Sequence, residues 1–307
     1  MNTDGEIVRL DPDDTAQLRV VAGFGSVPSL VETVKRTQVP DAQQILEHTR
    51  PRPAPATPLI SRRRGIVVGA SGGIGAALSR KLAREGFTLA LVGRNRSALQ
   101  ALCDEIDRTA GEPRARSYEH DVTQYDSVPE TLHRVIVDLG GLDAFVYTAG
   151  AIYFPAMDEF SFAEDHKIMD VNLLGAMAWM SAVAPFFQNA KSGQIVGISS
   201  VAGDRGRVGN PGYNASKAGL TNYLEALRNR LTRHGVNVLT VKPGMVRTDM
   251  LKGVNKVVFA VEPDEAADLI WNGMRRRKQT IYVAGIWKWI MLVIRHIPSI
   301  IFRRLSF

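Results

Sequence analysis

The chain has 307 residues, of which 45% are hydrophobic, and a formal net charge of +7 at pH 7. This length and composition suffice to bury a substantial core in one large domain, and no internal repeat is evident. Cys103 is the only cysteine, which excludes an intrachain disulfide and favours a reducing, cytoplasmic location. The six histidines show no metal-ligand spacing, so we predict no metal site and expect His120 and His234 to be ordinary surface or loop residues.

Residues 1–60 form the first predicted unit, an N-terminal extension. It begins with acidic residues and ends in a segment with prolines at positions 51, 53, 55 and 58, which favour an extended spacer. The start lacks the basic residues and the compact apolar core of a signal peptide. Two interpretations stay open, a mobile tail and a clamp that packs on the core or on a partner subunit, and no activity is assigned to it.

Residues 61–285 are predicted to form one α/β domain built on a doubly wound parallel sheet. Strand-like runs alternate with helical stretches such as 97–110 and 213–234, the pattern of a parallel sheet covered on both faces. The runs lie near Gly65, Leu89, Ala115, Ala144, Ile195, Val238 and Ile281. Ligands of such sheets bind beyond the carboxyl ends of the strands.

A glycine-rich segment, 69–75, follows the first apolar run and opens a helical pattern. Glycines there let the backbone approach a pyrophosphate, and the first amides of the helix stabilise its charge, so the segment predicts a phosphate cradle. A tight turn without a ligand is the simplest alternative. The segment also matches Gly-x-Ser-x-Gly, the nucleophile elbow of α/β hydrolases. Such an elbow normally follows several strands and an oxyanion loop, whereas a proline run and no convincing strand come before the first apolar run here, so Ser71 is expected to be a loop residue.

The end of the second apolar run indicates which nucleotide would bind. An acidic residue there would bind the ribose hydroxyls of NAD, and the chain has none at this point. Instead Gly93 leaves room and Arg94 offers a planar cation suited to the 2′-phosphate of NADP(H), with Arg96 as further help. The alternative is that Arg94 is a solvated loop residue. We predict NADP(H) as the cofactor.

Tyr213 and Lys217 stand four residues apart, one turn along a predicted helix. The ordinary pKa of a tyrosine is about 10, and a nearby cation favours the phenolate, which brings proton transfer toward neutral pH. Ser200, at the end of an earlier apolar run, supplies a hydroxyl that can hold a carbonyl oxygen beside the phenol. Together these residues indicate carbonyl/alcohol redox chemistry, although a Tyr-x-x-x-Lys pair alone more often marks a solvated helix edge.

These motifs, in this order, resemble the short-chain dehydrogenase/reductase family over most of the chain. The family's Gly-x-x-x-Gly-x-Gly corresponds to Gly69, Gly73 and Gly75, and its helix asparagine to Asn172. The resemblance implies a Rossmann fold and a cofactor site made of Gly69, Ser71, Gly73, Ile74, Gly75, Arg94, Asp121, Val122, Ala149, Gly150, Tyr213, Lys217, Pro243, Gly244, Val246 and Thr248. Asp121 would lie on the adenine side, and Pro243 to Thr248 would hold the nicotinamide carboxamide.

The resemblance also implies roles for the catalytic residues. NADPH would give hydride to a carbonyl carbon while Tyr213 protonates the oxygen and Ser200 donates a hydrogen bond to it. Lys217 would lower the pKa of Tyr213 and bind the nicotinamide ribose, and Asn172 would anchor a water that connects Lys217 to solvent. Members commonly pair through the helices that carry Asn172 and Tyr213, so we expect a homo-oligomer.

Two departures from the family pattern concern the support of the cofactor loop. Val68 stands where the family often has threonine, and Tyr147 and Thr148 replace paired asparagines. The hydroxyl of Thr148 can still bridge backbone groups. A member can also keep the nucleotide site and act as a non-catalytic NADPH-binding sensor or a membrane-associated scaffold, but the presence of Ser200, Tyr213 and Lys217 together favours an enzyme.

The substrate is indicated only in outline. In this family the pocket is lined by loops that correspond to 151–160 and 202–212 and by the region after Thr248. Apolar residues in these segments would form an apolar enclosure, which favours a lipophilic ketone or aldehyde as the substrate. The alternative interpretation is that these residues belong to ordinary core packing. They are Ile152, Tyr153, Phe154, Met157, Met245, Met250 and Leu251.

The carboxyl-terminal residues 286–307 form the last predicted unit, a basic apolar tail. Residues 269–307 contain eight Lys or Arg and no acidic residue, and the apolar run around Trp287 and Trp289 is interrupted by Lys288. The run is shorter than the ~20 residues that span a bilayer. Peripheral contact with an anionic membrane is the preferred interpretation, a lid over the substrate pocket is the alternative, and nucleic-acid binding ranks third for lack of a recognition motif.

Overall fold

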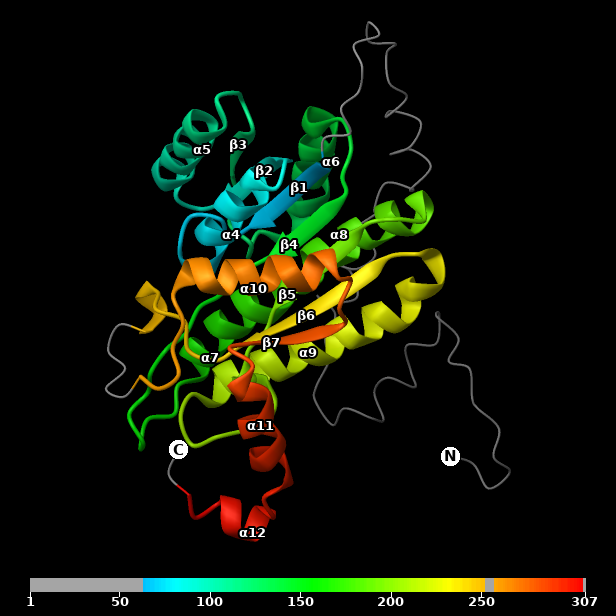
Figure 1. Ribbon diagram of the computed structural model, residues 1–307. Helices are drawn as coiled ribbons and strands as arrows, with labels where there is room; N and C mark the ends of the chain where they lie inside the picture. The colour runs from blue at the N-terminus through cyan, green and yellow to red at the C-terminus, as the bar shows by residue number, and fades with distance from the viewer. Residues whose placement is uncertain (1–62, 252–256, 306–307) are drawn as a thin grey trace, which may run out of the picture. The chain divides into compact units, whose positions relative to one another are not determined.

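The computed structural model describes residues 63–251 and 257–305, so the predicted extension 1–60 lies outside the described residues. Within those ranges, seven parallel strands form one sheet in the order β3-β2-β1-β4-β5-β6-β7 (Figure 1). The strands are β1 (Arg63–Val68), β2 (Phe87–Gly93), β3 (Ala115–Glu119), β4 (Ala144–Tyr147), β5 (Gln194–Ile198), β6 (Asn237–Pro243) and β7 (Thr280–Val283). Each coincides with a predicted strand-like run, so the prediction of a doubly wound sheet is confirmed.

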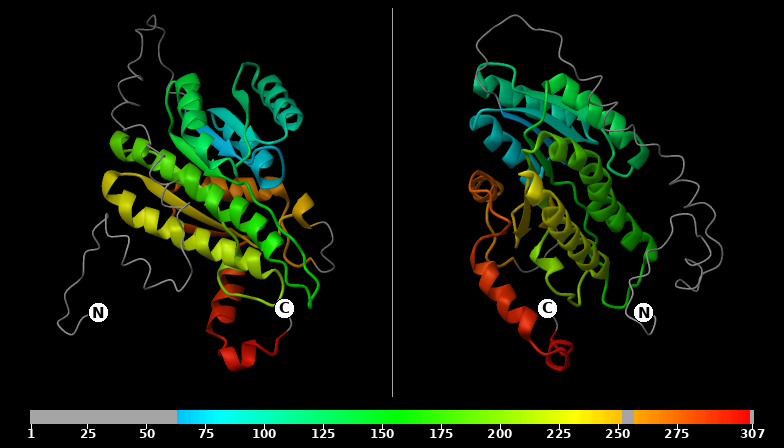
Figure 2. Two further views of the ribbon diagram at one scale, coloured as in Figure 1. Left: turned by 180° about the vertical axis from the view of Figure 1, so that it is seen from behind. Right: turned by 90° about the vertical axis from the view of Figure 1, so that its right-hand side faces the viewer.

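Helices cover both faces of the sheet (Figure 2). One face carries α4 (Gly73–Arg84), α5 (Arg96–Ala110) and α10 (Pro263–Arg275), and the other carries α6 (Val128–Leu139), α8 (Gly175–Ala190) and α9 (Pro211–Leu231). Short 3-10 turns at η1 (Tyr125–Ser127), η3 (Val201–Gly203), η4 (Thr232–His234) and η5 (Asp249–Leu251) connect these elements.

Alternating strand residues divide between two apolar cores. In β1, Val67 packs with the core under α4, α5 and α10, whereas Ile66 and Val68 pack with the core under α6, α8 and α9. Because both faces of the central strands are buried, these strands are mostly continuous apolar runs, whereas the edge strand β3 (Ala115–Glu119) is largely polar. Cys103 is buried in the first core, as expected, and burial raises its pKa to about 11.

The strand order reverses at β1, which pairs with β2 on one side and β4 on the other. At such a switch point the connections leave the sheet in opposite directions and open a crevice at the carboxyl ends of the strands. The loops that carry the glycine segment, Thr148 and Ser200 all start from this edge.

A long helical stretch from Phe162 to Ala190 contains a π-helical turn. It comprises α7 (Phe162–Met169), the π-helix η2 (Asp170–Leu174) and α8. The Tyr147 hydroxyl donates a hydrogen bond of 2.6 Å to the Val171 carbonyl within the π-turn. By length and composition this stretch could span a membrane, but Trp179 and its neighbours are buried in the second core, as in a core helix of a globular domain.

The C-terminal residues continue the fold as α11 (Ile286–His296) and α12 (Ser299–Phe302). Trp287 and Met291 on one side of α11 are buried in a small cluster with Val201. A Cβ atom on Gly244 would lie 1.9 Å from the Trp287 indole nitrogen, so this packing requires glycine at position 244. The segment predicted as a tail is therefore packed on the domain through its inner face.

Candidate active site

A cavity of about 1510 Å³ opens at the carboxyl ends of the strands. Its wall contains every predicted cofactor and catalytic residue except Asp121 and Asn172. The predicted residues in the wall are Gly69, Ser71, Gly73, Ile74, Gly75, Arg94, Val122, Ala149, Gly150, Ser200, Tyr213, Lys217, Pro243, Gly244, Val246 and Thr248. Residues that are distant in sequence thus meet around one space.

The glycine loop is fixed by close contact with the end of β4. Gly69 has φ +86°, a conformation that favours glycine, and a Cβ on Gly75 would lie 2.2 Å from the Gly69 carbonyl oxygen. The Thr148 hydroxyl bridges the carbonyl oxygens of Val68 at 2.8 Å and Gly69 at 3.0 Å, which confirms its expected supporting role. No side chain caps the start of α4 at Gly72, so its first amides are available to an anion.

The second loop of the cavity holds the predicted phosphate-binding arginine. Arg94 is 74% exposed, and its Nη1 lies 3.9 Å from Asp121 Oδ2. Asn95, Arg96 and Ser97 follow it in the cavity wall, where α5 begins. Two guanidinium groups and a helix N-terminus therefore stand together at this end of the cavity. Asn95 and Ser97 were not predicted, although the helix-start pattern after Arg94 could have suggested them.

Asp121 does not line the cavity, which contrasts with its predicted place on the adenine side. Its carboxylate accepts hydrogen bonds from the Thr123 amide and hydroxyl at 3.0 and 2.9 Å. Burial raises its pKa, but the Thr123 hydrogen bonds and the charge of Arg94 outweigh burial and lower the pKa below its ordinary value. Val122 takes its place in the wall. His120 is a loop residue after β3, as one of the two predicted alternatives states, but it is buried and lines the cavity, so it is not a surface residue.

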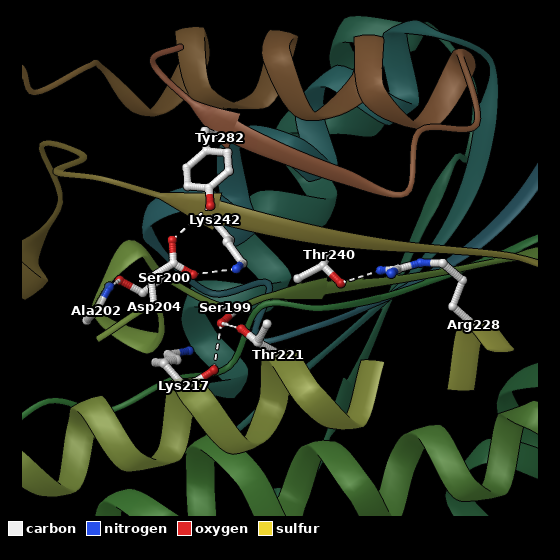
Figure 3. A network of polar contacts seen from close by, with 10 residues as sticks. All are labelled: Ser199, Ser200, Ala202, Asp204, Lys217, Thr221, Arg228, Thr240, Lys242 and Tyr282. Atoms are coloured by element: carbon white, nitrogen blue, oxygen red, sulfur yellow. Dashed lines mark hydrogen bonds and ion pairs between the residues drawn. The ribbon is translucent and has the colours of Figure 1, made fainter. Parts of the chain in front are cut away.

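The three predicted catalytic side chains come from two elements. Tyr213 and Lys217 lie one turn apart on α9, with Lys217 Nζ 5.7 Å from the centroid of the Tyr213 ring. Ser200 follows β5, and its hydroxyl accepts a hydrogen bond of 3.0 Å from the Ala202 amide. The neighbouring Ser199 donates a 2.9 Å hydrogen bond to the Lys217 carbonyl and so joins the end of β5 to α9 (Figure 3).

Burial governs the protonation of these groups. It raises the pKa of Tyr213 above its ordinary value, although hydrogen bonding with Ser200 and the charge of Arg207 act in the opposite direction. Lys217 was predicted to lower this pKa. Its ammonium instead donates a 2.9 Å hydrogen bond to the Ile198 carbonyl, and the lowering influences on Tyr213 are those of Ser200 and Arg207. Burial also lowers the pKa of Lys217 to about 8.

Asn172 lies in the π-turn, behind the wall of the cavity. Its amide group exchanges two hydrogen bonds with the backbone of Ala151, at 2.7 and 2.9 Å, and donates a third to Ser216 at 3.0 Å. The side chain therefore holds the loop after β4 against α9. A Cβ on Gly150 would lie 3.4 Å from Asn172 Oδ1 and 3.6 Å from Lys217 Nζ, which places both side chains beside that glycine.

The substrate end of the cavity is largely apolar. Of the predicted enclosure, Ile152, Phe154, Met245, Met250 and Leu251 line it. Tyr153 and Met157 do not, which corrects the prediction: the Tyr153 hydroxyl donates to Glu159, and Met157 is exposed. Sequence reasoning did not name Trp287 or Arg207, which also line the cavity, although Arg207 lies in the predicted pocket loop 202–212. No local pattern marks either one, because each reaches the site through the folding of a loop or of the C-terminal segment.

The sequence model described as short chain dehydrogenase matches residues 64–258. The chain belongs to this family. An uncharacterized oxidoreductase of Myxococcus xanthus (strain DK1622) is 36% identical over 218 residues, which cover 71% of this chain and 85% of the relative. The ketoacyl reductase HetN of Nostoc sp. is 33% identical over 181 residues, 59% of this chain and 62% of that protein.

A solved structure is similar over the same region. A variant of the actinorhodin polyketide ketoreductase with NADPH superimposes with a TM-score of 0.66 and 26% sequence identity, covering 73% of this chain and 96% of that chain. The fold and the oxidoreductase family are thus established.

The glycine loop yields a prediction with a matched control. Gly75→Ala would force a methyl group against the Gly69 carbonyl, whereas Gly72→Ala meets no atom within 4 Å. We expect Gly75→Ala to weaken NADPH binding at least tenfold and to cost about 1–3 kcal/mol of stability, with the stability of Gly72→Ala close to that of the parent. Fluorescence titration and thermal unfolding measure both effects. Equal behaviour of the two variants would contradict the proposed close contact.

The buried Lys217 predicts a pH-dependent stability. Its pKa falls from 10.5 to about 8 on folding, so between these values the unfolded chain binds a proton that the folded chain does not. The free energy of unfolding therefore rises with pH in this window, by up to about 3 kcal/mol. Urea denaturation at pH 8 and pH 10.5 should show this rise in the parent and not in Lys217→Met. The same pH slope in both proteins would show that Lys217 is not desolvated.

Proposed function

We propose that the protein is an NADP(H)-dependent reductase that converts a lipophilic ketone or aldehyde to an alcohol. The observation that carries this proposal is that Ser200, Tyr213 and Lys217 line the same cavity as the glycine loop. A hydroxyl, a phenol and an ammonium beside a nucleotide cradle are the groups that carbonyl reduction needs. The ketoacyl reductase and polyketide ketoreductase among the similar proteins support the same reaction class.

The cavity wall fits a dinucleotide with an added phosphate. The pyrophosphate would lie against the glycine loop and the uncapped start of α4, which Gly75 allows to pack closely on the Gly69 backbone. Arg94 and Arg96 would hold the 2′-phosphate, and no acidic side chain stands at the end of β2 to repel it. When bound, the nicotinamide supplies the hydride.

Tyr213 would act as the proton donor. Because burial raises its pKa, the phenol is protonated at neutral pH and can give its proton to the carbonyl oxygen as hydride reaches the carbon. Ser200 would hold that oxygen by donating its hydroxyl hydrogen. Burial lowers the pKa of Lys217 to about 8, and its side-chain nitrogen would bind the nicotinamide ribose. The proton that Tyr213 gives up returns from solvent, and a water anchored near Asn172 stays our proposed route.

A non-catalytic NADPH-binding sensor or scaffold is the competing function. It would use the glycine loop and Arg94 but would need neither a buried phenol nor Ser200. Both line the cavity beside Lys217, and the same wall contains the apolar side chains of Ile152, Phe154 and Met250. These features favour the enzyme. We further propose that two copies pair through η2–α8 and α9, as relatives of this family commonly do.

The exposed side of α11 and α12 supports peripheral contact with an anionic membrane by a cytoplasmic enzyme. Trp289 and Val293 are 62% and 66% exposed, and Ile300 and Ile301 extend the apolar surface onto α12. Lys288, Arg295, Arg303 and Arg304 flank it, and no acidic residue follows Asp268. If a second copy of the chain covered this surface, like charges would face one another. Anionic lipid headgroups would instead neutralise the basic side chains, and Trp289 would lie at the level of the headgroups. Trp287 on the opposite side of α11 lines the cavity.

Tyr213→Phe tests the acid role. The variant keeps the ring but loses the proton donor, so NADPH-dependent turnover should fall by at least a thousandfold while NADPH affinity stays within about twofold. Carbonyl-dependent oxidation of NADPH and fluorescence titration measure the two quantities. Turnover near the parental level would remove Tyr213 from this role.

Arg94→Ala tests the choice of cofactor. Loss of a charge-assisted pair to the 2′-phosphate should weaken NADPH binding about 10–100-fold and leave NADH binding nearly unchanged. The NADH titration of the same variant is the internal control for folding. The proposal fails if the parent binds NADH more tightly than NADPH, or if Arg94→Ala changes the affinity for neither nucleotide.

Vesicle flotation tests the membrane contact. The parent should float with vesicles rich in phosphatidylglycerol and not with pure phosphatidylcholine. The double variant Trp289→Ser/Val293→Ser should lose flotation, whereas Val137→Ser, which removes an exposed apolar side chain from α6, should retain it. Unchanged flotation of the double variant would exclude this surface, and failure of the parent to float would exclude the contact.

A further inference from the structure

The loop between β5 and α9 carries two arginines with different surroundings. Arg205 is fully engaged with the C-terminal segment. Its guanidinium donates hydrogen bonds to the carbonyl oxygens of Ile294 at 2.5 Å and Ile297 at 2.6 Å, and it lies 3.8 Å from the centroid of the Phe302 ring. This arginine therefore has a structural role, because it binds the carbonyls at the end of α11.

The acidic residue of the same loop is also engaged. Asp204 pairs with the Lys242 ammonium through one carboxylate oxygen and accepts the Tyr282 hydroxyl at 2.8 Å through the other (Figure 3). The Asp204 and Lys242 side chains are only 2% and 9% exposed. A buried pair of this kind is neutral as a unit, so the charge of Asp204 is matched before Arg207 is considered.

Arg207 differs from its neighbours because no side chain among the described residues pairs with it at contact distance, although the charge of Asp204 acts on it from farther away. It lines the cavity and is half-buried, yet its guanidinium makes no hydrogen bond or ion pair with any residue in 63–251 or 257–305. The loop around it is held in place, since Asn214 Nδ2 donates to the Arg207 carbonyl at 3.2 Å and to the Gly209 carbonyl at 2.9 Å. A planar five-donor cation thus faces a cavity with its hydrogen-bonding capacity unused.

The place of Arg207 in the cavity separates it from the cofactor phosphates. The groups that suit those phosphates are the glycine loop and Arg94, which follow β1 and β2. Arg207 follows β5 on the loop that leads from Ser200 to Tyr213, and its charge acts on the Tyr213 phenol. A cation partly removed from water favours an anion that replaces the lost hydration, and a guanidinium matches the geometry of a carboxylate or phosphate.

We propose that Arg207 binds an oxyanion on the substrate, a carboxylate or a phosphate, close to the carbonyl that is reduced. This inference rests on the proposed function of the cavity and specifies its substrate class. The substrate is an anionic amphiphile: its charged group pairs with Arg207, its carbonyl lies at Tyr213, and its apolar part lies along Phe154 and Met250.

Binding measurements test the proposal without requiring turnover. Calorimetric titration of the NADP⁺-loaded protein compares decanoate and decyl phosphate, as the two anion classes, with neutral decanamide. We expect the parent to bind at least one anion 10–100-fold more tightly than the amide, and Arg207→Met to lose this preference. Arg207→Lys should restore part of it. Arg230→Met, which removes an exposed arginine farther along α9, is the matched control and should keep it.

The outcomes separate this inference from the proposed function. Equal affinity of the parent for the anions and the amide, or an anion preference that survives in Arg207→Met, overturns the Arg207 site. If Arg207→Met fails to fold, the comparison of ligands on the parent and on Arg207→Lys decides the question. An anion preference that depends on Arg207, with no NADPH oxidation by 2-, 3- or 4-oxodecanoate or a keto-alkyl phosphate, supports the site and contradicts the reductase.

Discussion

The close approach between the glycine loop and the end of β4 is the constraint on which the site depends. At this point the Thr148 hydroxyl bridges the carbonyl oxygens of Val68 and Gly69, and no Cβ can be added at Gly69 or Gly75 without a clash. The strand order reverses here, so the same contact that joins β1 to β4 also opens the crevice and aims the first amides of α4 into it. The backbone contact that holds the sheet together at this point therefore also forms the nucleotide cradle.

The loop between β5 and α9 adds chemistry to that cradle. It begins with Ser200 and ends at the helix that carries Tyr213 and Lys217, and its middle is held by the buried Asp204–Lys242 pair. The same loop provides Arg205, which binds the end of α11. Reaction centre, proposed anion site and C-terminal segment consequently share one support. A change in the position of α11 would be transmitted directly to the wall beside the substrate.

The sequence predicted the features that arise from local pattern. The buried central strands are mostly continuous apolar runs, and glycine is required where backbone approaches backbone, so the sheet and the cradle could be recognised before the structure was known. The i, i+4 pair of Tyr213 and Lys217 was recognisable for the same reason. Thr148 was correctly expected to bridge backbone groups, because a hydroxyl at the end of a buried strand needs a hydrogen-bond partner and backbone groups are the nearest ones.

Features that arise from tertiary packing could not be predicted. Whether Asp121 faces the cavity or its own turn depends on a Thr123 hydrogen bond, and whether Tyr153 and Met157 face inward depends on a loop without periodicity. Arg205 meets carbonyls about ninety residues away, and Trp287 enters the wall only because Gly244 leaves space for its ring. The balance that sets the pKa of Tyr213 likewise depends on burial, which spacing along a helix does not reveal.

The central claim is that one cavity brings a dinucleotide and the Ser200, Tyr213 and Lys217 side chains together. A crystal structure of the protein with NADPH tests it most directly. The account predicts the pyrophosphate against the glycine loop, the 2′-phosphate within hydrogen-bond distance of Arg94, and the nicotinamide ring beside the Tyr213 hydroxyl with Lys217 on its ribose. A nucleotide bound elsewhere, or bound with its nicotinamide away from Tyr213, would contradict the account.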